Sequence, residues 1–173
     1  MLKCILMGVS GCGKTSIGKA LASKFAITFL DGDLLHLKHN IDKMAQGLPL
    51  NDNDRAPWLE RVGDVFYAAE HLHTSVLIAS SCLKKAYRDY LVSYHPGLIF
   101  IYLKGDKKTI LSHMQERRGH FMKSDLLDSQ FLTLEEPCKD EPYIHSVSIA
   151  ADFNTTLNSC IRILDNIKHT LEK

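Results

Sequence analysis

The sequence predicts an α/β protein with a five-stranded parallel sheet flanked by helices. Segments that fit buried strands alternate along the chain with segments whose apolar residues recur at helical spacing. This alternation is typical of parallel strands joined by crossover helices, which cover both faces of the sheet. A glycine-rich loop follows the first predicted strand, and polar residues follow the second and third strands. Because ligands bind beyond the carboxyl ends of parallel strands, we expect these groups to meet over one crevice.

The elements follow from the local patterns. Apolar runs predict strands at residues 2–7, 28–30, 76–80 and 98–103, with a weaker strand at 144–149. Helical spacing predicts helices at residues 14–25, 40–45, 54–72, 83–93, 107–118, 126–134 and 155–171. Asn53 or Asp54 can cap the long third helix, and Pro57 suits its first turn. No linker or repeat divides the chain, so residues 1–173 are expected to form one domain.

The composition excludes several classes of protein. The formal net charge is only +1, so bulk attraction to nucleic acid or to an acidic membrane is not expected. The longest apolar run is far shorter than the roughly 18 residues that a membrane span needs. The five cysteines are scattered and odd in number, which predicts free thiols in a reducing compartment. We therefore expect a cytoplasmic protein without a nucleic-acid or membrane partner.

The glycine-rich loop fits the phosphate-binding motif GxxxxGK[ST]. It comprises Gly8, Val9, Ser10, Gly11, Cys12, Gly13, Lys14 and Thr15. The glycines let the backbone curl so that its N–H groups face a phosphate, and the following helix adds its positive N-terminal end. Lys14 can reach the outer phosphates, and the Thr15 hydroxyl can ligate Mg²⁺. The motif predicts a site for the phosphates of a nucleotide.

Two carboxylates flank a glycine at the end of the second predicted strand. Asp31 can hold Mg²⁺ through water, and Asp33 can orient or deprotonate the hydroxyl group of a phosphoryl acceptor. Such a pair is also common in turns and helix caps. The neighbouring phosphate loop favours the catalytic interpretation.

A set of basic residues and histidines is a candidate for substrate binding: His36, Arg55, Lys84 and Arg88. A helix that begins near residue 83 would place Lys84 and Arg88 four positions apart on one face. There they can clamp a carboxylate, although a solvated charged face is the commoner arrangement.

A lid is predicted at about residues 117–137. Arg117, at the end of the predicted helix 107–118, can swing over the phosphates and stabilise the transferred charge. His120 follows it and is a further candidate for substrate binding. The alternative is that basic residues here simply favour a helix C-terminus.

Seven segments together resemble the gluconokinase family: LMGVSGCGKT (6–15), LDGDLLH (30–36), NIDKMAQGLPLNDNDRAPWL (40–59), LKKAYRDYL (83–91), FIYLKGD (100–106), RRGHFM (117–122) and LLDSQFLTLEEP (126–137). The resemblance implies a P-loop fold like that of nucleoside monophosphate and shikimate kinases. It implies transfer of the ATP γ-phosphoryl group to O6 of D-gluconate, which gives 6-phosphogluconate for the pentose phosphate pathway. It also implies Mg²⁺ and a possible homodimer.

The resemblance assigns roles by position. Residues 8–15 would bind ATP and Mg²⁺, and Asp33 would face the acceptor hydroxyl. Arg55, Lys84 and Arg88 would meet the sugar acid, which needs a cationic clamp for its carboxylate.

Three other functions remain as alternatives. A shikimate-like or nucleotide kinase is the nearest, although no base-stacking pocket for a nucleotide acceptor is identifiable. A GTPase normally carries an NKxD motif, and residues 40–43 have these letters in a different order. A non-catalytic nucleotide-binding protein would not need Lys14, Thr15, Asp33 and Arg117 together.

Overall fold

The computed structural model describes residues 1–116 and 124–171. Within them the strands are β1 (Lys3–Met7), β2 (Thr28–Asp31), β3 (Val76–Ala79), β4 (Leu98–Lys104) and β5 (Ile144–Ser148). They form a five-stranded sheet in the order β2-β3-β1-β4-β5, and every pairing is parallel. The predicted fold class is confirmed.

The central strand β1 shows why the sheet has a core on each side. Its residues are all buried, as expected for a parallel strand covered on both faces. Because side chains alternate along a strand, Cys4 and Leu6 enter one apolar cluster while Ile5 and Met7 enter the other.

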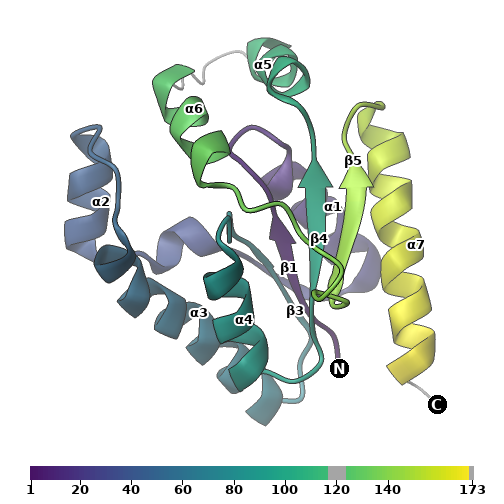
Figure 1. The fold of residues 1–173 in the computed structure, drawn as a ribbon. Coiled ribbons are helices and arrows are strands. Elements are labelled where there is room, and N and C mark those ends of the chain that lie inside the picture. The colour runs from purple at the N-terminus through teal and green to yellow at the C-terminus, as the bar shows by residue number, and fades with distance from the viewer. Residues whose placement is uncertain (117–123, 172–173) are drawn as a thin grey trace.

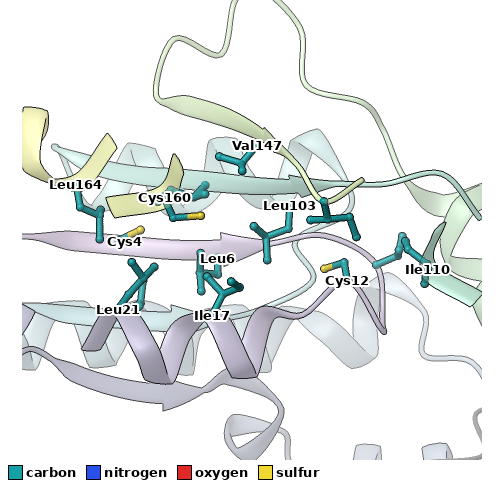
Figure 2. Close-up of a cluster of buried hydrophobic side chains, with 14 of the residues drawn as sticks. Cys4, Leu6, Cys12, Ile17, Leu21, Leu103, Ile110, Val147, Cys160 and Leu164 are labelled. Atoms are coloured by element: carbon teal, nitrogen blue, oxygen red, sulfur yellow. The ribbon is translucent and has the colours of Figure 1, made fainter. Parts of the chain in front are cut away.

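The helices divide between these two clusters. Helix α1 (Lys14–Phe25) and helix α7 (Phe153–Leu171) pack in the first, where Figure 2 shows Leu21, Cys160 and Leu164 close to β1. Helix α3 (Asp52–His71) and helix α4 (Lys85–Tyr94) pack in the second.

Of the remaining helices, α5 (Lys107–Glu116) and α6 (Ser124–Thr133) lie beyond the carboxyl ends of the strands, and α2 (Lys38–Ala45) lies to one side near the same ends (Figure 1). A short 3-10 helix, η1 (Gly32–Leu35), follows β2 directly. The loops after β1, β2 and β3 therefore open toward the same edge of the sheet, where the sequence predicts the crevice.

Several helix boundaries differ from the prediction by one or two residues, and two of these differences affect the site. Helix α3 begins at Asp52 because Asn51 and Asp54 form a capping box, so Asn51 is the cap instead of Asn53 or Asp54. Helix α4 begins at Lys85, and Lys84 precedes it with extended backbone angles of φ −90° and ψ 141°.

The sequence also predicts free cysteines and no membrane-spanning segment. In residues 1–116 and 124–171, no helix is both long and apolar enough to cross a bilayer. All five cysteines are free thiols, and only Cys138 is exposed.

Candidate active site

The phosphate loop joins β1 to α1 in the conformation that its glycines allow. Gly8, Gly11 and Gly13 have φ angles of 139°, 84° and 98°, which side chains rarely permit. A Cβ atom on Gly8 would also lie 2.9 Å from the carbonyl oxygen of Leu103. Lys14 donates from Nζ to the carbonyl oxygens of Gly8 and Val9 at 2.8 and 3.0 Å, so its ammonium group lies against the loop.

Cys12 belongs to this loop by its backbone and to the core by its side chain. The thiol is 3% exposed and packs in the same apolar cluster as Ile17, Leu103 and Ile110 (Figure 2). The side chain therefore points away from the phosphate site, and the Cys12 N–H donates to the Val9 carbonyl oxygen at 3.4 Å.

Thr15 and Asp31 lie side by side, as the predicted metal site requires. The Thr15 hydroxyl donates to Oδ2 of Asp31 at 3.2 Å, and Oδ1 of Asp31 accepts from the Asp33 backbone N–H at 3.2 Å. Asp31 thus caps η1 and also contacts the first turn of α1. A hydroxyl and a carboxylate beside a phosphate loop are oxygen donors of the type that Mg²⁺ prefers, so these residues fit that ion.

Asp33 lines the same cavity as Ser10 of the phosphate loop. Burial raises the pKa of its carboxyl group, the charge of Asp31 raises it further, and Lys14 partly offsets the rise. Asp33 therefore lies close enough to Asp31 and Lys14 for their charges to affect its pKa. The turn that holds it is fixed by Trp58, whose Nε1 donates to the Gly32 carbonyl oxygen at 2.8 Å.

A cavity of about 300 Å³ opens beside Asp33. It lies between the phosphate loop, the η1 turn, the start of α3, the segment after β3, and α6. Its lining includes Ser10, Asp33, His36, Arg55, Tyr87 and Gln130. The cavity places a carboxylate, an imidazole and a guanidinium within reach of one small polar molecule.

His36 enters this cavity as a neutral side chain. Its ring stacks on Trp58 with centroids 4.8 Å apart, and Nδ1 lies 3.5 Å from Nδ2 of Asn40. Burial and the nearby Arg55 lower the pKa of His36 to about 4. The imidazole can therefore exchange hydrogen bonds with a ligand at neutral pH, but it does not add positive charge.

The two cations Arg55 and Lys84 differ in position. Arg55 lines the cavity. Lys84 donates to both carboxylate oxygens of Asp52 at 2.6 and 2.8 Å, and its ammonium group lies 5.7 Å from the ring centroid of Tyr87. Tyr87 also donates to Asp52, so these three side chains form one polar group beside the cavity.

Arg88 corrects the prediction of a Lys84–Arg88 clamp. Its side chain is fully buried, and it pairs with the equally buried Glu141 at 2.6 Å. Lys84 stands before α4 instead of within it, so the two cations do not share a helix face. Direct substrate binding by Arg88 is wrong because its guanidinium is turned into the protein and is occupied there.

The predicted lid residues Arg117 and His120 lie outside the described residues. Part of the lid segment is described as α6, and it contains a residue that the sequence analysis missed. Gln130 accepts from the Ser10 backbone N–H at 2.6 Å through Oε1, so α6 touches the phosphate loop directly. The sequence offered only one local indication of this role, namely that Gln130 is the single amide side chain in the segment 126–137.

The comparisons with known proteins show the family of the chain. The shikimate kinase family matches residues 10–159 of the chain. The thermosensitive gluconokinase of Escherichia coli strain K12 is 49% identical over 156 residues, which are 90% of this chain and 83% of that protein. The thermoresistant gluconokinase of the same strain is 45% identical, over 92% of this chain and 91% of that protein.

Solved structures give the same result. A gluconokinase from Sinorhizobium meliloti 1021 superimposes with a TM-score of 0.83 and 38% identity, and covers 98% of this chain and 97% of its own. A shikimate kinase from Acinetobacter baumannii, solved with shikimate, shares only 19% identity at a TM-score of 0.55, so it supports the fold alone. The chain therefore belongs to the gluconokinase family of P-loop kinases with the shikimate kinase fold.

Proposed function

We propose that this kinase transfers the γ-phosphoryl group of ATP to O6 of D-gluconate. The observation that carries the proposal is the position of Asp33, which lies between the phosphate loop and a cavity lined by Arg55. The relatives named gluconokinase, at 45–49% identity, favour gluconate as the acceptor over shikimate or a nucleotide.

The nucleotide is held by the phosphate loop. Its backbone N–H groups and the Lys14 ammonium group bind and neutralise the phosphate oxygens. Thr15 and Asp31 would hold Mg²⁺, which when bound neutralises charge on the phosphates. Lys14 sits at the loop through two carbonyl contacts, so a small movement of its side chain brings it to a phosphate.

Asp33 accepts the proton of the acceptor. The O6 hydroxyl attacks the γ-phosphorus, its proton passes to Asp33, and the bond from the γ-phosphorus to the bridging oxygen breaks to release ADP. Desolvation by the surrounding protein and the charge of Asp31 raise the pKa of Asp33, which makes its carboxylate a stronger base than an ordinary aspartate. The products are 6-phosphogluconate and ADP.

Arg55 binds the carboxylate of gluconate, because it is the cation that lines the cavity among the described residues. His36 and the polar group of Lys84, Asp52 and Tyr87 exchange hydrogen bonds with the hydroxyl groups. We infer that Arg117 and His120, which lie outside the described residues, complete the site. All five cysteines are free thiols, which favours a reducing compartment such as the cytoplasm as the place of action. Analytical ultracentrifugation tests whether the protein forms the possible homodimer.

The test is an assay of ATP consumption with gluconate, shikimate and nucleoside monophosphates as acceptors. We expect turnover with gluconate to exceed the others by at least a hundredfold in kcat/KM. Preferred turnover of shikimate or of a nucleotide would replace the proposed acceptor with that alternative.

A further inference from the structure

A fully buried ion pair lies directly behind the acceptor cavity. Arg88 of α4 donates from Nε and Nη2 to the two carboxylate oxygens of Glu141 at 2.6 and 3.0 Å. Nη1 of the same guanidinium donates to the carbonyl oxygens of Cys82 and Leu83 at 3.2 and 3.0 Å. Both side chains have no exposed surface. The pair therefore joins the segment before β5 to the segment that follows β3.

The segment whose carbonyl groups accept from Arg88 has an unusual backbone conformation at Cys82. Cys82 has a φ of 41°, a left-handed conformation that residues other than glycine rarely adopt. Ser81, Cys82 and Leu83 all line the cavity. The Ser81 carbonyl oxygen also accepts from the Gly8 N–H at 3.3 Å, so the same segment touches the start of the phosphate loop. Its conformation therefore affects the shape of the acceptor site.

Glu141 is itself firmly held. One of its carboxylate oxygens accepts from the Cys138 backbone N–H at 3.1 Å. Burial opposes ionisation of this carboxyl group, but hydrogen bonds from Arg88 and Cys138 outweigh it and lower its pKa. Arg88 thus meets a charged and fixed partner at neutral pH.

Stability alone does not account for such a pair. Replacing a buried ion pair with apolar residues of similar volume is often neutral or stabilising, whereas removing one partner is strongly destabilising. We propose that Glu141 is a positioning residue, which acts through Arg88 to fix the Ser81–Leu83 wall of the cavity and so sets the affinity for the acceptor. The identity of that acceptor rests on the proposed function.

The test is the double variant Arg88→Met/Glu141→Leu, which removes both charges and keeps the volume. We expect its free energy of unfolding to stay near that of the wild type. We expect KM for gluconate to rise at least tenfold, because the Cys82 carbonyl group loses the Arg88 donor and the Leu83 carbonyl group keeps only the Glu135 N–H. KM for ATP should stay within twofold, since the phosphate loop keeps its other contacts.

The control is Lys3→Met/Glu70→Leu. In this second ion pair the Lys3 side chain is 9% exposed and the Glu70 side chain is 33% exposed, and Lys3 also donates to the Pro96 carbonyl oxygen. Lys3 begins β1, so the pair lies at the amino ends of the strands, away from the cavity. It should change stability without changing KM for gluconate. A purely structural role for Arg88 and Glu141 predicts the same of their double variant, because unfolded enzyme lowers the maximal rate and leaves KM unchanged.

A double variant with a KM for gluconate within twofold of the wild type overturns the proposal. If that variant folds poorly, Glu141→Gln is measured in its place, with KM again read on the folded fraction, and an unchanged KM has the same meaning. Lack of gluconate turnover by the wild type would contradict the proposed function instead, and KM would then be measured with the acceptor that the wild type uses.

Discussion

The Thr15 hydroxyl lies 3.2 Å from Oδ2 of Asp31 and donates a hydrogen bond to it. This contact joins the first turn of α1 to the end of β2. Because the other oxygen of Asp31 accepts from the Asp33 N–H, the contact also links the nucleotide side of the site to the proposed catalytic carboxylate.

The first prediction concerns this link. The charge of Asp31 is the second cause, after burial, of the raised pKa of Asp33. Removing the charge in Asp31→Asn should therefore lower the pKa of Asp33, while burial keeps it above its ordinary value. Carboxyl ¹³C NMR titration of the protein without Mg²⁺ measures this directly. A pKa of Asp33 that is unchanged or higher in the variant would show that the two charges do not interact.

Arg55 and Lys84 should contribute unequally to gluconate binding. Truncation of Arg55, which lines the cavity, in Arg55→Gln should raise KM for gluconate roughly 10- to 100-fold, the effect of losing a charged hydrogen bond. Lys84→Gln should have a smaller effect because Asp52 already neutralises Lys84. Lys85→Gln is the matched control, since Lys85 pairs with the exposed Asp89 on α4. Steady-state kinetics with an equal rise in KM for all three would contradict the assignment.

Gln130 should affect the nucleotide through Ser10. Gln130→Met removes the acceptor of the Ser10 N–H, whereas Gln130→Glu keeps an acceptor oxygen and adds negative charge beside the phosphate loop. Because like charges repel, kcat/KM for ATP should fall further in Gln130→Glu than in Gln130→Met. The reverse order would place the Gln130 side chain away from the bound phosphates.

The neutral state of His36 predicts a loss of stability in acid. Its folded-state pKa of about 4 lies below the ordinary value of 6.5, so the unfolded chain binds the proton first as the pH falls. Stability from this group is present above pH 6.5 and is lost toward pH 4; about 2 kcal/mol is gone by pH 5. Urea unfolding at pH 7 and pH 5 measures the difference. His36→Gln should show a smaller difference than the wild type, and equal differences would contradict the assignment of a neutral His36.

Local patterns predicted the fold and the nucleotide side of the site well. The apolar run of β1 and the spacing of Gly8, Gly13 and Lys14 are properties of adjacent residues, so they can be read without knowing the fold. The rule that ligands meet beyond parallel strands placed Asp31 near Thr15, and the structure confirms that contact.

The acceptor side was harder to predict for two reasons. Its contacts depend on the exact residue at which a helix begins, and they join residues that are far apart in the sequence. A start of α4 two residues later than predicted moved Lys84 out of the helix, which separated it from Arg88. The partner of Arg88 is Glu141, 53 residues away, and no local pattern identifies such a pair. Gln130 reaches Ser10 across 120 residues for the same reason.

The central claim is that Asp33 accepts the proton of the phosphoryl acceptor, and Asp33→Asn tests it most directly. The amide has the same size but cannot accept the proton. The account predicts that kcat with gluconate falls by roughly 10²- to 10⁴-fold while the dissociation constant for ATP, measured by calorimetry, stays within twofold. A variant that retains the wild-type kcat would contradict the account, because the reaction would then have no need of this carboxylate.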